Sequence, residues 1–274
     1  MANLDGTSVI ITGGARGLGR SMALALIAAG AKVLVVDIDN DQIEAMCKEA
    51  GKNAQGIRAD VTDERGINDV VEKCLHVFGH IDMVVNNAGI SLSTIRPGDR
   101  YSNPIRFYEL TGADVRRFVD LHLIAPFLLS RTAVKYMTEQ GWGRIVTVTT
   151  GLDTMTRAGQ APYGPSKAGS EAFAAIMARD LEGTGVTVNV LIPGGQADTR
   201  FIPELPGLSR ASLVSPEKMG PPIVWLASRE SDGVTARRFM ANQWDTAISP
   251  QAAAERAGAP IAWSIEGSFE GPQK

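Results

Sequence analysis

Tyr163 and Lys167 are the two residues whose types and spacing best fit a chemical role. They lie four positions apart, so on a helix their side chains share one face about one turn apart. A neighbouring ammonium favours the phenolate, which predicts that the pKa of Tyr163 falls towards neutrality. Such a tyrosine can give or take a proton while a hydride moves. The spacing alone is a weak signal, because it also arises by chance in a chain of 274 residues.

The residues before this pair place a hydroxyl group beside it. An apolar run over 144–149 is typical of a buried parallel strand, and a helical pattern follows over 168–181. Thr150 stands at the end of the strand, where its hydroxyl can donate a hydrogen bond to a substrate carbonyl or alkoxide. Thr149 is a weaker candidate for this role, because successive side chains of a strand point to opposite faces.

A glycine-rich segment near the N-terminus predicts a phosphate site. It lies between a short apolar strand over 8–11 and an Ala/Leu-rich helix that reaches about Ala29. Glycines in this position let the backbone approach a pyrophosphate, and the helix N-terminus adds free N–H groups and a positive dipole. An ordinary tight turn is the alternative, but the strand before and the helix after favour the phosphate site. The predicted cofactor-binding residues here are Gly13, Arg16, Gly17, Leu18 and Gly19.

Asp37 ends the next apolar strand, over 32–36, about 20 residues after the glycines. A carboxylate there accepts hydrogen bonds from the adenosine ribose and repels a 2′-phosphate. The cofactor is therefore predicted to be NAD rather than NADP. Arg16 weakens this preference, because a basic side chain in the glycine loop can also meet a phosphate.

Strand and helix patterns alternate along the first half of the chain. Helical patterns cover about 41–50 and 64–78, and short strands end at Asp60-Val61 and at 83–85. This spacing predicts right-handed βαβ units, and hence an α/β fold: a single-domain, Rossmann-type, doubly wound parallel sheet with helices on both faces. Residues 1–245 form the predicted dinucleotide-binding and catalytic domain. Residues 246–274 are an extension, with a helix predicted from Pro250, and are too short to be a separate domain.

Five motifs occur in the order seen in short-chain dehydrogenases/reductases, and the chain resembles that family over about residues 5–240. The motifs are Thr12-Gly13-x-x-x-Gly17-x-Gly19, Asp60-Val61, Asn86-Asn87-Ala88-Gly89, Tyr163-x-x-x-Lys167 and Pro193-Gly194. The resemblance implies a nicotinamide cofactor and a homotetramer or homodimer. It also implies further cofactor contacts, at Asp60, Val61, Asn87, Ala88, Gly89, Tyr163, Lys167, Pro193, Gly194 and Gln196.

The chain departs from the family's usual catalytic set of Asn, Ser, Tyr and Lys at two positions. Thr150 occupies the serine position and keeps the hydroxyl. His122 occupies the asparagine position, where the family's residue holds a water that links the lysine to solvent. We expect His122 to hold that water or to relay the proton itself. The alternative is an interior histidine with no catalytic role.

Three further segments differ from the family or flank its cleft. Between Gly89 and His122 the chain is about ten residues longer than the family's usual spacing, and the extra stretch is 91–110. Its arginines, Arg96, Arg100 and Arg106, are candidates to clamp an anionic substrate. A solvated loop or a subunit contact is the alternative. Residues 196–217 are expected to form a mobile substrate lid. The extension is expected to cap the substrate cleft of its own or a neighbouring subunit, and its last residues, 266–274, have a composition typical of poor order.

Composition excludes several classes of protein. The formal net charge is −3 with mixed charges, so no nucleic-acid partner is expected, and no apolar run is long enough for a membrane span. The N-terminus lacks the features of a signal peptide. Cys47 and Cys74 have no metal-ligand spacing, so they are expected to be free thiols in a reducing compartment. A cytoplasmic protein without a metal is predicted.

Together these features predict an NAD-dependent oxidoreductase that transfers a hydride between the cofactor and a small alcohol or carbonyl substrate. The predicted catalytic residues are Thr150, Tyr163, Lys167 and His122. One alternative is an epimerase or lyase that retains NAD. The other is a non-catalytic dinucleotide sensor, which the two replacements in the catalytic set leave open.

Overall fold

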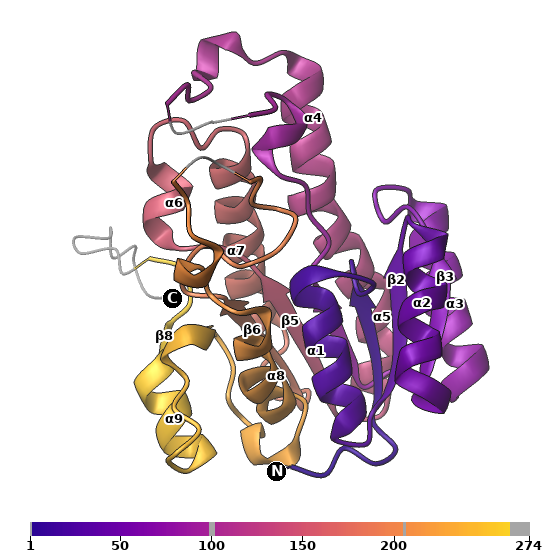
Figure 1. Cartoon of the computed structure of the whole chain (residues 1–274). Coiled ribbons are helices and arrows are strands. Elements are labelled where there is room, and N and C mark those ends of the chain that lie inside the picture. The colour runs from indigo at the N-terminus through magenta and orange to yellow at the C-terminus, as the bar shows by residue number, and fades with distance from the viewer. Residues whose placement is uncertain (1, 99–101, 205–206, 264–274) are drawn as a thin grey trace, which may run out of the picture.

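The computed structural model describes residues 2–98, 102–204 and 207–263. Arg100 and the segment 266–274 lie outside these residues. A central sheet runs through the molecule with strand order β3-β2-β1-β4-β5-β6-β7-β8 (Figure 1). The strands are β1 Ser8–Thr12, β2 Lys32–Asp37, β3 Ala54–Arg58, β4 Met83–Asn86, β5 Gly143–Val148, β6 Val186–Ile192, β7 Arg237–Met240 and β8 Gly258–Pro260. All pairs are parallel except β7 with β8.

Helices cover both faces of the sheet, as the doubly wound prediction requires. The helices are α1 Gly17–Ala28, α2 Asn40–Ala50, α3 Glu64–Phe78, α4 Gly112–Val119, α5 Ala125–Glu139, α6 Leu152–Thr156, α7 Tyr163–Asp180, α8 Gly220–Leu226 and α9 Pro250–Ala257. One core packs α1, α2, α8 and α9 on one face, and a second packs α3, α5 and α7 on the other.

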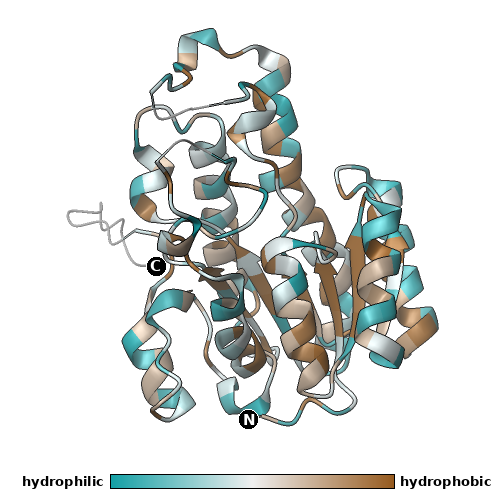
Figure 2. Ribbon diagram, viewed as in Figure 1, coloured by the Kyte–Doolittle hydropathy of each residue, from teal (hydrophilic) through white to brown (hydrophobic). Residues whose placement is uncertain are grey.

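The hydrophobic pattern of the strands explains this arrangement. Every residue of β1 is buried, and its side chains alternate between the two cores: Val9 and Ile11 join the first, and Ile10 joins the second. A strand covered on both faces is apolar throughout, which is the pattern of parallel sheets in α/β proteins. Figure 2 shows the central strands as the most hydrophobic part of the ribbon.

The described part of the extension joins the sheet. Helix α9 buries Ala253, Ala254 and Ala257 in the first core, and β8 pairs antiparallel with β7. Its described residues do not line the main cavity, so they do not cap the cleft of their own subunit. Across the described ranges, none of the helices has the length and apolar character needed to cross a bilayer.

One strand boundary differs from the prediction. Strand β3 ends at Arg58, before Asp60 and Val61. The Asp60 carboxylate accepts hydrogen bonds from the backbone N–H and the hydroxyl of Thr62, at 2.9 and 2.7 Å, and so holds a turn instead. Such local side-chain bonds compete with a strand ladder.

Candidate active site

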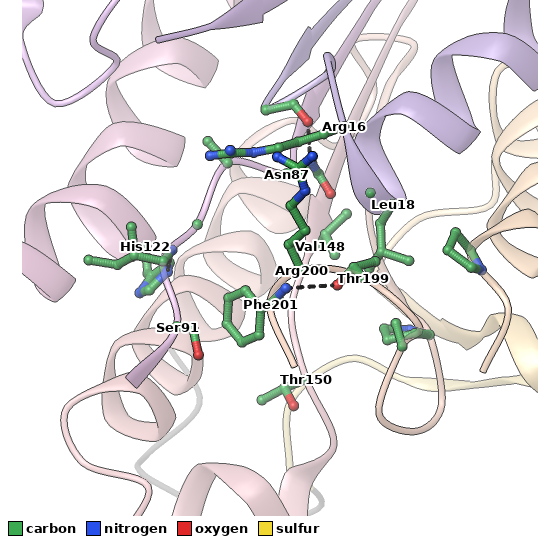
Figure 3. A pocket seen from close by; sticks show the side chains of 18 of the residues that line it. Arg16, Leu18, Asn87, Ser91, His122, Val148, Thr150, Thr199, Arg200 and Phe201 are labelled. Atoms are coloured by element: carbon green, nitrogen blue, oxygen red, sulfur yellow. Dashed lines mark hydrogen bonds between the residues drawn. The ribbon is translucent and has the colours of Figure 1, made fainter. Parts of the chain in front are cut away.

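A cavity of about 1450 Å³ opens at the carboxyl ends of the strands (Figure 3). Open α/β sheets bind their ligands at this edge. The cavity exceeds the usual range of about 300–1,000 Å³ for small-molecule pockets, so it has room for a dinucleotide together with a substrate. All predicted site residues but Gly19 line it: Gly13, Arg16, Gly17, Leu18, Asp37, Asp60, Val61, Asn87, Ala88, Gly89, His122, Thr150, Tyr163, Lys167, Pro193, Gly194 and Gln196.

The glycine loop needs its glycines for shape and space. Gly13 has a φ of +61°, and a Cβ there would lie 3.0 Å from the Asn87 amide nitrogen and from the Ala88 Cα. Gly17 has a φ of +56°, and a Cβ there would lie 3.2 Å from Thr199. L side chains rarely adopt such φ values, so both positions favour glycine.

The N-terminus of α1 has the features of an anion site. Its N-cap residue, Arg16, makes no capping hydrogen bond with its side chain, and the first turn carries no acidic residue. The orphan N–H groups and the helix dipole therefore remain for a phosphate. Gly19 was predicted to bind the cofactor, but it does not line the cavity. A Cβ there would lie 2.1 Å from the Gly13 carbonyl oxygen, so this glycine allows α1 to pack closely against the loop.

Thr12 and Asn87 fix the two central loops to each other. The Thr12 hydroxyl accepts hydrogen bonds from the backbone N–H groups of Asn87 and Ala88, at 3.0 and 3.1 Å. The Asn87 amide donates to the carbonyls of Thr12 and Gly13, at 2.9 and 3.1 Å. The loops that follow β1 and β4 are therefore held together by four hydrogen bonds next to the cavity.

Asp37 lies at the end of β2 with only 7% of its surface exposed. Its two carboxylate oxygens accept hydrogen bonds from the backbone N–H groups of Ile38, at 2.9 Å, and Ala15, at 3.4 Å. These bonds fix the Asp37 carboxylate on the cavity wall, at the carboxyl end of β2. Arg16 and Arg200 line the same cavity (Figure 3).

Tyr163 and Lys167 both lie on α7, which begins at Tyr163 rather than after the pair. Lys167 is 5% exposed, and its ammonium donates to the Val148 carbonyl at 2.7 Å. Burial lowers the pKa of Lys167 to about 8. The Tyr163 ring packs against Phe201 of the segment after β6, with ring centroids 5.5 Å apart.

The two threonines at the end of β5 point in different directions. The Thr149 hydroxyl is buried and donates to the Glu171 carboxylate at 2.8 Å. Thr150 lines the cavity, and Figure 3 shows its side chain there. This alternation matches the choice of Thr150 over Thr149 as the substrate-facing hydroxyl.

His122 lies in a π-helical turn, Asp120–Ile124, between α4 and α5. Such turns occur frequently at functional sites. The ring is fully buried and packs edge-on against Tyr163, with centroids 5.2 Å apart. Nε2 accepts from the backbone N–H of Ile90 at 3.0 Å, and Nδ1 lies 3.3 Å from the Ser166 hydroxyl.

These partners assign the tautomer of His122. Because the Ser166 hydroxyl donates to the Tyr163 carbonyl at 2.8 Å, it accepts from Nδ1–H, and Nε2 carries no proton. Burial first, and then the Lys167 charge, hold the pKa of His122 well below its usual value. Both ring nitrogens have protein partners, which favours positioning over proton relay. Relay by His122 stays a prediction.

The described arginines of the 91–110 segment do not line the cavity. Arg96 pairs with Glu109 at 2.9 Å and donates to Asn103 at 3.3 Å. Arg106 begins the short turn Phe107–Glu109, where its N–H donates to the Glu109 carboxylate. These bonds hold the segment together, which agrees with a surface loop or a subunit contact rather than with an anion clamp.

The lid segment does border the cavity. Phe201 and Ile202 line it, and Ile202 is 5% exposed. Arg210 stabilises the segment by pairing with Asp198 and by donating to the carbonyl of Ile202 at 2.9 Å. Leu205, another apolar residue of this segment, lies outside the described residues.

Cavity residues that the sequence analysis did not single out include Thr199, Arg200 and Arg238. Thr199 and Arg200 stand in an irregular segment, where spacing carries no information about direction. Arg238 lies in β7, and a charged residue inside an otherwise buried strand was the available signal. Over the described ranges, no group of three or more His, Cys, Asp and Glu side chains gathers to hold a metal ion.

Known proteins resemble this chain in sequence. A family model described as short chain dehydrogenase matches residues 7–205. The 3-oxoacyl-(acyl-carrier-protein) reductase FabG of Escherichia coli is 33% identical over 192 residues, covering 70% of this chain and 74% of that protein. FabG of Salmonella typhimurium is 30% identical over 248 residues, covering 88% of this chain and 97% of that protein.

Solved structures share the fold. A 3-ketoacyl-(acyl-carrier-protein) reductase from Brucella melitensis, complexed with NADH, superposes with a TM-score of 0.75 at 24% identity, covering 85% of this chain and 95% of the other. Levodione reductase superposes with a TM-score of 0.74 at 26% identity, covering 84% and 94%. The chain therefore belongs to the short-chain dehydrogenase/reductase family, whose members are oxidoreductases that use a nicotinamide dinucleotide.

Proposed function

We propose that this protein is an NAD-preferring dehydrogenase or reductase that transfers a hydride between the cofactor and a small alcohol or ketone. One observation carries the proposal: Tyr163, Lys167 and Thr150 line the same cavity as the glycine loop and Asp37. The cavity therefore combines a proton donor, Tyr163, with Lys167, which lowers the pKa of that donor, and with the Thr150 hydroxyl. The phosphate-binding glycine loop and the Asp37 carboxylate line the same cavity.

The residues that line the cavity match the successive parts of a dinucleotide. The glycine loop and the N-terminus of α1 hold the pyrophosphate, and Asp37 binds the adenosine ribose. Lys167 and Tyr163 line the same cavity and bind the nicotinamide ribose. When bound, the nicotinamide supplies or accepts the hydride.

The chain's own groups move the proton. Tyr163 donates a proton to the carbonyl oxygen in the reductive direction, and takes it from the alcohol in the oxidative one. Lys167 favours the phenolate through its charge, and the Val148 carbonyl fixes its ammonium at 2.7 Å. Thr150 donates a hydrogen bond to the substrate oxygen, where charge develops. His122 holds the loop after β4 and the Tyr163 ring in place.

We infer an uncharged substrate from the side chains next to Tyr163. The described arginines of the 91–110 segment do not line the cavity, and the Arg96 side chain is bonded to Glu109 and Asn103. Phe201 and Ile202 give the lid an apolar face beside Tyr163. A small ketone or secondary alcohol therefore meets hydroxyl groups at its reacting oxygen and apolar groups around its substituents.

A redox screen tests the proposal. We would incubate the purified protein with NADH or NADPH and a panel of ketones and aldehydes, and with NAD and a panel of alcohols, hydroxy acids and polyols. The expected result is net oxidation of NADH by at least one uncharged carbonyl compound. Thr150→Val should slow this turnover, whereas Thr150→Ser, which keeps the hydroxyl, should restore most of it.

Other results of the screen identify the alternatives. Cofactor that survives purification without any net redox change would favour an epimerase or lyase. Cofactor binding without turnover of any compound by any route would favour a sensor. Faster turnover with NADPH than with NADH would contradict the proposed cofactor preference.

We also propose that the protein is a homodimer or homotetramer. Helix α7 carries Ile176 with 54% of its surface exposed, next to the stacked rings of Phe127 and Phe173. Burying such an apolar helix face against a second copy removes it from water. Light scattering on the purified protein measures the mass directly, and a monomer would contradict this proposal.

A further inference from the structure

Glu171 and Arg238 form a buried ion pair that contacts Thr149 and Thr150, the two residues after β5. Glu171 of α7 is fully buried, and the side chain of Arg238 in β7 is 8% exposed. The Arg238 Nε donates to Glu171 Oε1 at 2.9 Å. We propose that Glu171 and Arg238 are positioning residues, which fix the Thr149–Thr150 backbone so that Thr150 presents its hydroxyl to the substrate. The inference rests on the role proposed for Thr150.

Arg238 holds the backbone of Thr150 itself. Its Nη2 donates to the Thr150 carbonyl at 2.9 Å, while its Nε serves Glu171. The planar guanidinium thus uses two donors in two fixed directions, which an ammonium does not reproduce. One side chain therefore links the carboxylate to the peptide group that follows the substrate-facing hydroxyl.

Glu171 holds the neighbouring residue from the opposite side. Its Oε2 accepts from the Thr149 hydroxyl at 2.8 Å. Its Oε1 accepts from Arg238 and from the backbone N–H of Ala262 at 3.1 Å. The carboxylate therefore ties the end of β5 to the C-terminal extension, which lies beyond the family match over residues 7–205.

Three consecutive residues are fixed in this way. Lys167 binds the Val148 carbonyl, Glu171 binds the Thr149 hydroxyl and Arg238 binds the Thr150 carbonyl. Thr150 is the last of them, and its side chain faces the cavity. Catalytic groups have to be held close to their productive geometry by neighbours that are themselves fixed. The buried pair supplies that support where regular strand structure ends at Val148.

Arg238→Lys separates this role from simple stability. A lysine keeps the charge next to Glu171, but it lacks the second donor directed at the Thr150 carbonyl. The expected result is a fall in kcat of between about 10- and 100-fold, the cost of a slightly misplaced reacting group. NADH affinity should not change. The primary kinetic isotope effect with deuterated NADH should rise, because hydride transfer becomes slower relative to the other steps.

The chain offers a matched control in Arg144. It is also a buried arginine of the sheet, pairs with Asp232 and donates to the Ser228 carbonyl at 3.2 Å. It lies on β5 at the end away from the cavity and does not line it. Arg144→Lys should lower stability without changing kcat or the isotope effect.

A second variant keeps the test valid if Arg238→Lys folds poorly. The double variant Glu171→Gln, Arg238→Met removes both charges of this pair, so it leaves neither partner as an unpaired buried ion. It still lacks the donor to Thr150, and it should fold, bind NADH and show the same loss of kcat. Normal turnover by this variant would overturn the proposal.

Hydrogen exchange gives a readout that does not depend on activity. Peptides that cover residues 148–156 should exchange faster in Arg238→Lys than in the unmodified protein, and should not change in Arg144→Lys. Unchanged exchange in Arg238→Lys would refute the positioning role, even in a protein that turns over no substrate. A raised KM with unchanged kcat and isotope effect would also refute it, because Arg238 would then bind the substrate directly. Absence of any turnover with faster exchange would instead count against the proposed function alone.

Discussion

His122 Nε2 accepts a hydrogen bond from the backbone N–H of Ile90 at 3.0 Å. This bond joins the π-helical turn between α4 and α5 to the loop that follows β4, whose first residues line the cavity. A protonated ring would turn Nε2 into a donor that faces another donor. The neutral form of His122 is therefore part of how the loop is held.

The neutral, buried state of His122 predicts a pH-dependent stability. Its pKa lies well below 6.5 in the folded protein and close to 6.5 in the unfolded chain. As the pH falls below about 6.5, the unfolded chain takes up a proton that the folded protein does not, so the free energy of unfolding decreases by up to about 1.4 kcal/mol per pH unit. His122→Asn removes this contribution.

Urea unfolding at several pH values between 5 and 7.5, with both proteins, measures the difference. His76 and His80 are present in both, so their contributions cancel. His122→Asn should also stay active, whereas His122→Leu should lose turnover while still binding cofactor. If His122→Leu matches the unmodified enzyme at every pH, the histidine only packs. Parallel pH slopes for the two proteins would contradict the assignment of a neutral ring.

The sequence was most informative where function depends on local backbone. Gly13 and Gly17 occupy positions with positive φ, Asp37 ends an apolar strand, and Tyr163 and Lys167 share one helix. Asp37 is itself the last residue of β2, and each of these arrangements depends on residues close together in the chain. The fold followed for the same reason, because apolar strands alternating with amphipathic helices leave few other ways to bury both sheet faces.

The missed features depend on distant contacts. Glu171 and Arg238 are 67 residues apart, and neither the helix pattern nor the strand pattern shows that they meet. Strand β8 contains only Gly258-Ala259-Pro260, whose residue types have low strand propensity, and it is defined by its backbone pairing with β7. Gly19 belongs to the cofactor motif, yet only the packing of α1 shows that its missing side chain makes room for the Gly13 carbonyl.

Tyr163→Phe tests the proton-transfer role. The substitution removes the hydroxyl but keeps the ring contacts with His122 and Phe201. Turnover should fall at least about 100-fold, the lower end for the loss of a general acid–base. Cofactor affinity, measured by titration of NADH fluorescence, should change little. Tyr136→Phe is the matched control, because Tyr136 lies on α5 outside the cavity and its variant should keep full activity. Near-normal turnover of Tyr163→Phe would exclude the assigned role.

Asp37→Asn tests the cofactor preference. Asparagine keeps an oxygen that can accept from the Ile38 N–H, but it removes the charge that repels a 2′-phosphate. NADP affinity should therefore rise relative to NAD affinity. Asp69→Ala, on α3 and away from the cavity, removes the same net charge and should leave the ratio unchanged. Isothermal titration of each protein with both cofactors measures the ratio. Tighter NADP than NAD binding by the unmodified protein would defeat the prediction at its first step.

Lys167 predicts a stability change at alkaline pH. Burial lowers its pKa to about 8 in the folded protein, whereas lysine in an unfolded chain titrates near 10.4. Between these values the unfolded chain holds a proton that the folded protein has released, so the free energy of unfolding rises with pH across about 8 to 10.4. The penalty for burying the ammonium is thus greatest below pH 8 and is gone above the pKa of the unfolded chain.

Lys167→Met should remove this rise in the free energy of unfolding, of up to about 1.4 kcal/mol per pH unit, whereas Lys135→Met, on α5 outside the cavity, should keep it. Denaturant unfolding of the three proteins at pH 7.5, 8.5 and 9.5 gives the slopes, and an identical slope for Lys167→Met and the unmodified protein would show that the lysine titrates normally.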